Sequence, residues 1–153
     1  MKVTMRVVLC VVGAMLALTG CAPGTGDIAG FEKRLAALPG VDGALVEVQH
    51  PGLPTNTNVA IWLFVESVDV ESVATTTRKV AGVARTDDGV RGQQVDLSVV
   101  KGKRADFPNR QDVVGKTVPV MHLVAAALGL PEANGNMLVL SPAEIAKLAD
   151  AEG

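Results

Sequence analysis

Apolar residues recur along residues 27–153 at spacings that alternate between those of helices and those of strands. A first helix is predicted from about Asp27 to Leu38, where apolar residues stand three or four positions apart. Strands, in which apolar and polar residues alternate or form short runs, are predicted at Ala44–Gln49, Val59–Glu66, Val95–Val99 and Met137–Leu140. Further helices are predicted at Val70–Ala84, Pro119–Leu128 and Pro142–Ala151, with Gly129 as the stop of the second.

The strand at Val59–Glu66 differs from the others because both of its faces are apolar. One face carries Val59, Ile61, Leu63 and Val65, and the other carries Ala60, Trp62 and Phe64. Such a strand is typical of the centre of a sheet that is covered on both sides. Trp62 and Phe64 are therefore expected under a covering helix, or, in the alternative, as the lining of an apolar groove.

The order of the elements predicts an α+β fold, with an antiparallel sheet of three to four strands covered by helices. The first five elements follow the split pattern of a ferredoxin-like sandwich without its opening strand. Met137–Leu140 could fill the vacant place in such a variant. The local signal for the last helix is strong, because Ser141 and Glu144 have the spacing of a capping box with Pro142 at the first helical position.

Residues 1–20 have the pattern of a secretory signal. Lys2 and Arg6 precede a 12-residue run without charge, Val7–Leu18. This run is too short for a permanent membrane-spanning helix, which needs about 20 residues. A basic start, a short apolar run and small residues at its end are typical of a cleaved signal.

The end of that run, Leu18-Thr19-Gly20-Cys21, resembles the lipobox of bacterial lipoproteins. The resemblance implies a diacylglyceryl thioether on Cys21 and cleavage between Gly20 and Cys21. The membrane partner would then be lipid attached through Cys21. A plain cleaved signal followed by a free cysteine, or an uncleaved anchor helix, is the alternative. The richness in Ala, Val and Gly also resembles that of envelope lipoproteins of high-GC bacteria such as actinobacteria.

This organisation divides the chain into a lipoprotein signal (1–20), a lipidated cysteine with its tether (21–26) and one α+β domain (27–153). The five residues after Cys21 span at most about 18 Å, which would keep the domain near the membrane. Cys10 would leave with the signal and Cys21 would carry lipid, so no thiol would remain for a disulfide or a metal. The expected location is the extracytoplasmic side of the cell membrane.

Composition and charge narrow the possible functions. The chain has 153 residues, of which 48% are hydrophobic and only 3% aromatic, so a core of aliphatic side chains is expected. The formal charge of −2 becomes −4 once Lys2 and Arg6 are removed. A mildly acidic surface argues against nucleic acid as a partner, since that binding needs a basic field.

No catalytic or metal site is predicted, and no cofactor. His50 is expected in a loop and His122 on the surface of a helix. Nothing in their spacing brings them together with a carboxylate, as a metal site would require. Asp87-Asp88-Gly89 is expected to form a tight turn rather than a calcium loop. The basic residues between Lys101 and Lys116 are expected in a solvated loop, with contact to anionic headgroups as the alternative.

Together these features predict a membrane-anchored envelope lipoprotein that acts as a non-catalytic binding or accessory module, with an envelope protein as its partner. Two alternatives come from different classes. A carrier of lipid or an apolar small molecule would use the Val-rich, Leu-rich sheet and Trp62. An envelope hydrolase or metal enzyme would use His50 or His122.

Overall fold

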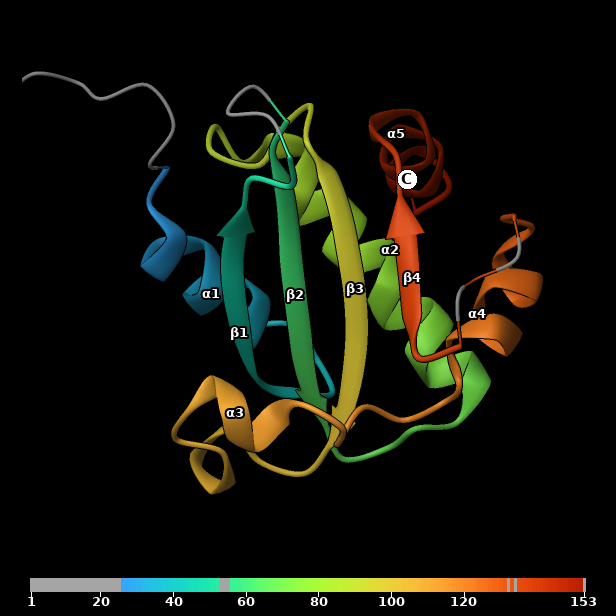
Figure 1. Cartoon of the computed structure of the whole chain (residues 1–153). Coiled ribbons are helices and arrows are strands. Elements are labelled where there is room, and N and C mark those ends of the chain that lie inside the picture. Colours follow the sequence, from blue (N-terminus) through green and yellow to red (C-terminus); the bar gives the residue numbers. More distant parts are fainter. Residues whose placement is uncertain (1–25, 53–55, 132, 134, 153) are drawn as a thin grey trace, which may run out of the picture.

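The computed structural model describes residues 26–52, 56–131, 133 and 135–152 (Figure 1). The predicted signal, the lipobox with Gly20 and Cys21, and the tether before Gly26 lie outside these residues. No helix among the described residues has the length and apolar character needed to cross a membrane.

The fold is α+β, as predicted, and is built on one open sheet of four strands. The strands lie side by side in chain order: β1 (Val41–Gln49), β2 (Asn58–Val65), β3 (Gln94–Lys101) and β4 (Met137–Leu140). The sheet is mixed rather than antiparallel throughout. The pairs β1–β2 and β3–β4 are antiparallel, whereas β2 and β3 run parallel in an unbroken register from Asn58↔Gln94 to Val65↔Lys101.

The parallel pair also corrects the predicted ferredoxin-like arrangement. In a split βαβ unit another strand lies between the two strands that the helix connects. Here β2 and β3 pair directly, and β4 pairs with the outer side of β3. No gap is left between β2 and β3 for a further strand, so Met137–Leu140 does not lie between them. The connection is helix α2 (Val70–Thr86), which returns the chain along the sheet so that β3 starts at the same end as β2.

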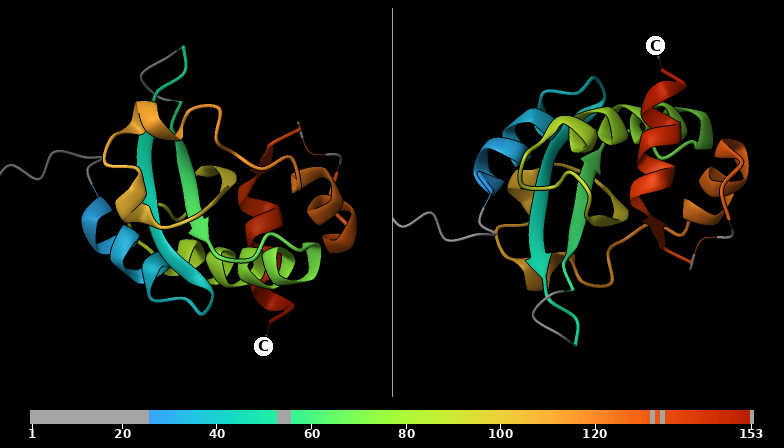
Figure 2. Two further views of the ribbon diagram at one scale, coloured as in Figure 1. Left: turned by 90° about the horizontal axis from the view of Figure 1, so that it is seen from below. Right: turned by 90° about the horizontal axis from the view of Figure 1, so that it is seen from above.

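The helices α1 (Ile28–Ala36) and α2 cover one face of the sheet (Figure 2). Helices α4 (Met121–Leu128) and α5 (Pro142–Asp150) pack against α2. The main core lies between this layer and the sheet. It includes the odd-numbered residues of β2, which are Val59, Ile61, Leu63 and Val65, together with Phe31, Leu35, Val95, Leu97 and Val99.

A second, smaller core lies on the other face of the sheet. Between β3 and α4 the chain crosses this face through a 3₁₀ turn, η1 (Arg104–Asp106), and the short helix α3 (Arg110–Val113) (Figure 2). Buried in this core are Phe64, Val100 and Val113, with Leu45, Trp62 and Phe107 packed against them. Strand β2 is thus covered on both faces, which explains why its sequence is almost continuously apolar.

Side-chain caps fix where several helices begin and end. The Ser141 hydroxyl accepts a hydrogen bond from the Glu144 backbone N–H, and the Glu144 carboxylate accepts from the Ser141 N–H at 2.7 Å, so the predicted capping box of α5 is confirmed. Gly129 ends α4 with φ of 63°, a left-handed conformation that favours glycine. Helix α4 starts at Met121, so Pro119 precedes the helix rather than occupying its first turn.

Strand β1 forms an edge of the sheet, and helix α1 contributes a side chain to that edge. The backbone N–H of Val46 donates to the Glu32 carboxylate at 2.7 Å. A backbone donor on the outer side of an edge strand has no strand to pair with, so Glu32 supplies the missing acceptor.

Candidate functional site: a cleft beside the start of helix α2

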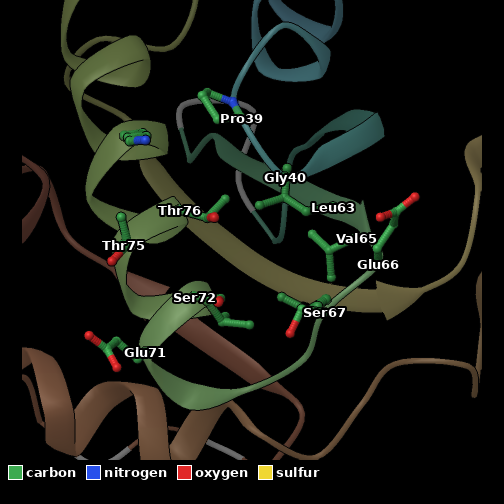
Figure 3. Close-up of a pocket in the computed structure, with 13 residues that line it drawn as sticks. Pro39, Gly40, Leu63, Val65, Glu66, Ser67, Glu71, Ser72, Thr75 and Thr76 are labelled. Carbon is green, nitrogen blue, oxygen red and sulfur yellow. The ribbon is translucent and has the colours of Figure 1, made fainter.

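The candidate site is a cleft of about 490 Å³ on the helical side of the sheet (Figure 3). It is formed by the Pro39–Gly40 turn after α1, the end of β2 with the following Glu66 and Ser67, the first half of α2, and Val99 of β3. Its volume falls in the range of about 300–1,000 Å³ that is usual for small-molecule sites.

The floor of the cleft is aliphatic and rigidly held. It is formed by Leu63, Val65, Val73 and Val99, all of which are almost fully buried in the main core. Side chains held in a packed core keep their positions, so these residues form a rigid base beneath the cleft while exposing little surface of their own. The cleft lies near the carboxyl ends of the parallel strands β2 and β3, where open α/β sheets commonly bind ligands.

One face of helix α2 gives the cleft a polar wall. Ser72, Thr76 and Lys79 all line the cleft, and their spacings of four and three residues place them on one side of the helix. Figure 3 shows Thr76 projecting from α2 toward Leu63 and Gly40, whereas Thr75 and Glu71 project to the other side of the helix.

Thr76 is the most buried of the three residues on this wall. The residue is only 8% exposed, and its hydroxyl makes no hydrogen bond within the described part of the chain. Its neighbour Thr77, which is fully buried, instead donates its hydroxyl proton to the Val73 carbonyl at 2.8 Å. The structure contains no fully buried side-chain oxygen or nitrogen that lacks a hydrogen-bond partner among the described residues, so the Thr76 hydroxyl is in contact with the water of the cleft.

Charged groups stand at the mouth of the cleft. Glu66 and Glu71 are exposed near the junction of β2 and α2, and Lys79 is half-buried two turns farther along the helix. Within residues 26–52, 56–131, 133 and 135–152, none of the three forms an ion pair. Lys79 and the two glutamates therefore lie at different ends of the cleft.

The start of α2 is fixed by its cap, Asp69. The Ser67 hydroxyl donates to this carboxylate, and the Ser72 backbone N–H donates to it at 2.8 Å. These two hydrogen bonds, the one from Ser67 above all, stabilise the ionised form and lower the pKa of Asp69 from 3.8 to about 2. Ser67 and Ser72 also line the cleft, so the cap positions one side of the site.

The groove predicted at Trp62 and Phe64 lies on the opposite face of the sheet, and its Phe64 half is filled. Phe64 is 0% exposed, and its ring centroid lies 5.4 Å from that of Phe107. Trp62 is half-buried beneath the guanidinium of Arg110, which lies 5.7 Å from the ring centroid and contacts Glu47 at 2.8 Å. The cover is therefore the η1–α3 segment and not one of the large helices.

The two histidines are exposed and belong to different elements. His50 follows β1, with its Nδ1 3.3 Å from the Thr57 hydroxyl, and His122 lies near the start of α4. In the ranges that the structure describes, no group of three His, Cys, Asp or Glu side chains could hold a metal ion.

The predicted turn at Asp87-Asp88-Gly89 is confirmed, and its first aspartate organises it. The buried Asp87 carboxylate accepts from the backbone N–H groups of Gly89 and Val90, at 2.8 and 3.1 Å, and pairs with Arg34 of helix α1. The turn is thereby tied to the first helix of the domain.

The cleft and the start of the domain lie at opposite ends of α2. Gly26 packs against Gly89, just beyond the last turn of α2, whereas the cleft lies beside the first half of that helix. A 17-residue helix is about 25 Å long. The basic residues between Lys101 and Lys116 also begin at the end of β3 that lies away from Gly89.

Sequence reasoning missed the cleft because no single segment builds it. The available signal was the run Thr75-Thr76-Thr77 inside a predicted helix, since threonine is a poor helix former and requires a reason there. No family model, no curated protein and no solved structure matches the chain.

Proposed function

We propose that the chain is a membrane-anchored lipoprotein of the cell envelope, lipidated on Cys21, whose domain is a non-catalytic binding module on the extracytoplasmic side. The observation that carries this proposal is the sequence Leu18-Thr19-Gly20-Cys21, placed directly at the end of a 12-residue uncharged run. A signal of this kind delivers the chain across the membrane, and a diacylated cysteine then holds it there.

The start of the domain supports the same proposal. The carbonyl of Gly26 accepts a hydrogen bond from the Ile28 backbone N–H at 2.7 Å, and Asp27 caps α1 through the Gly30 N–H. Gly26, the first residue that the structure describes, is the fifth residue after Cys21. A lipid on Cys21 would hold the end of the domain that contains Gly26 and Gly89 close to the bilayer.

The experiment is intact-mass analysis of the protein isolated from membranes, with a matched pair of cysteine variants. The wild-type mass should correspond to residues 21–153 with a diacylglyceryl group on Cys21. Cys21→Ala should abolish both the lipid and the cleavage, whereas Cys10→Ala should leave the mature mass unchanged, because Cys10 departs with the signal. A mature protein that starts at Met1, or an unmodified Cys21, would contradict the proposal.

A carrier of an apolar small molecule is the second candidate, and the cleft beside α2 favours it. Its volume of about 490 Å³ and its lining of both polar and apolar residues are typical of small-molecule sites. Native mass spectrometry of the gently purified protein distinguishes the two. A co-purified small molecule supports the carrier, and a protein partner captured by crosslinking supports the accessory module.

A further inference from the structure

We propose that residues 102–116 form a displaceable strap over a docking surface for a protein segment in which an arginine stands three positions before an apolar residue. The docking surface consists of four side chains on β1, β2 and β3: Leu45, Trp62, Phe64 and Val100. The proposal rests on the domain being a binding module, and it names the chemistry of the partner. It does not depend on the lipidation of Cys21.

The strap is built from one short motif that occurs twice. Residues 104–107 and 110–113 share the order arginine, any residue, aspartate, apolar residue. In both copies the aspartate accepts a hydrogen bond from the backbone N–H three positions earlier, at 3.3 Å for Asp106 and 3.0 Å for Asp112. The two motifs therefore form two successive turns of the same kind.

The arginines of the two motifs make matching contacts with two aromatic residues of β2. The guanidinium of Arg104 lies 5.6 Å from the ring centroid of Phe64, and that of Arg110 lies 5.7 Å from the ring centroid of Trp62. Because Trp62 and Phe64 are two positions apart in a strand, their side chains project from the same face. Each turn of the strap thus covers one ring, and the strap runs in the opposite direction to β2 (Figure 2).

The docking surface suits a segment that is both cationic and apolar. Its aromatic rings attract a cation, and the carboxylate of Glu47 contacts Arg110 at 2.8 Å beside them. Phe107 and Val113, the apolar residues of the two motifs, pack into the small core between the strap and the sheet. The strap itself therefore shows which pattern of side chains this surface accepts.

The strap is attached to the sheet by side chains and holds its own backbone together. Every backbone–backbone hydrogen bond that residues 103–115 form in the described part of the chain joins them to another strap residue. Val113 is the one strap residue that is buried, and most of the others are exposed. The strap can therefore leave the docking surface without breaking a backbone hydrogen bond to the rest of the domain.

The ends of the strap are fixed next to each other at the end of β3. The Gly102 N–H donates to the Val65 carbonyl at 3.0 Å, and Thr117, which follows the strap, pairs with Val100. A surface loop whose ends lie close together is an Ω-loop, a type that is frequently functional. With fixed ends and few buried apolar contacts, such a loop opens as a unit while the sheet stays folded.

The test is a fluorescence titration of the protein as the cell processes it, held in detergent micelles, because Trp62 is the single tryptophan of the chain. The probe is a synthetic peptide of residues 102–116. Phe107→Ala weakens the tethered strap, so this variant should bind the peptide about tenfold or more tightly than the wild type does. Val114→Ala, in the same strap but 65% exposed, is the matched control and should bind like the wild type.

Two further measurements separate specific recognition from apolar contact and from a folding defect. A peptide with glutamine in place of both arginines should bind Phe107→Ala about tenfold or more weakly, since it lacks the charged groups. Hydrogen exchange of the wild-type protein needs no substitution. The strap amides should exchange together, about a hundredfold or more faster than those of β2.

Four results would each overturn the proposal. Three of them are no saturable fluorescence change in folded Phe107→Ala, equal binding of the arginine and glutamine peptides, and strap amides that exchange as slowly as those of β2. The fourth is a dimer, detected by light scattering, in which each strap covers the other copy. The mass of the Cys21 adduct is measured separately, so failed lipidation and failed peptide binding give different results.

Discussion

Gly26 lies directly against Gly89, backbone against backbone. A Cβ atom added to Gly26 would stand 2.4 Å from the Gly89 Cα, and one added to Gly89 would stand 2.6 Å from the Gly26 Cα. No side chain fits between these two segments. The first described residue of the domain is thereby seated on the turn that follows α2.

This contact predicts that Gly89→Ala destabilises the domain by about 1 kcal/mol, because the added methyl group must push the two segments apart. Thermal unfolding measures the effect. Gly82→Ala is the matched control: it lies in α2 with its nearest neighbour, a Glu152 carboxylate oxygen, at 3.9 Å, and it should stabilise by about 0.5–1 kcal/mol through helix propensity. Equal effects of the two substitutions would show that the contact has no importance.

Asp87→Ala should cost about 2 kcal/mol or more of unfolding free energy. The buried carboxylate accepts two backbone N–H groups and pairs with Arg34, and its removal leaves these donors without an acceptor. The adjacent Asp88 is 94% exposed and meets Arg91 at 3.5 Å, so Asp88→Ala should change stability by less than about 0.5 kcal/mol. Urea denaturation measures the unfolding free energy of both variants. The prediction is contradicted if the two values differ by less than about 1 kcal/mol.

Ser141→Ala should destabilise the domain by about 1 kcal/mol, because it leaves the Glu144 backbone N–H at the start of α5 without its acceptor. Ser141→Thr keeps a capping hydroxyl and should retain most of the stability. Hydrogen exchange at the first turn of α5 localises the effect. Equal loss in the Ala and Thr variants would indicate a packing defect instead.

Acid should weaken the start of α2 in a defined pH window. The pKa of Asp69 is lowered to about 2 in the folded chain by the Ser67 and Ser72 hydrogen bonds, from an ordinary 3.8. The ionised cap therefore contributes its full stabilisation above about pH 4, and this is lost as the pH falls from about 4 to about 2. An NMR titration of the carboxyl group should give a midpoint near 2.

A matched variant identifies the cause of this shift. Ser67→Ala removes the hydroxyl that contributes most, so the midpoint of Asp69 should rise toward 3.8. Asp69→Asn should remove this contribution to the acid sensitivity altogether. An Asp69 midpoint that stays near its ordinary value in the unaltered protein would contradict the hydrogen-bonded cap.

The sequence carried enough information to predict the elements but not all of their pairings. The two apolar faces of β2 predicted a central strand, and the structure confirms it between β1 and β3. The alternation of Asp96 and Ser98 with apolar residues predicted a strand, and the sheet was expected to be antiparallel, yet β3 pairs with β2 in parallel. Periodicity reports which sides of a strand are buried, and it does not report which neighbour lies beside it.

The segment that covers Phe64 and the cleft beside α2 could not be predicted from the sequence either, because periodicity does not show which elements become neighbours. The η1–α3 segment is polar along most of its length, and only Phe107 and Val113 reach the small core. The cleft brings Pro39 and Lys79, which are 40 positions apart in the sequence, to one site. Such sites depend on tertiary placement, whereas the caps at Ser141 and Gly129 are local and were predictable.

The hydrogen bond between Glu32 and the Val46 N–H has a consequence for crowding. An exposed strand edge invites another copy to add itself as a further strand, which leads to aggregates. In the proposed membrane-anchored state, molecules would diffuse in two dimensions and meet often at the same height, so the risk would be greater than in solution. Because the Glu32 carboxylate occupies this donor on the outer side of β1, the donor is not available to a strand of another copy.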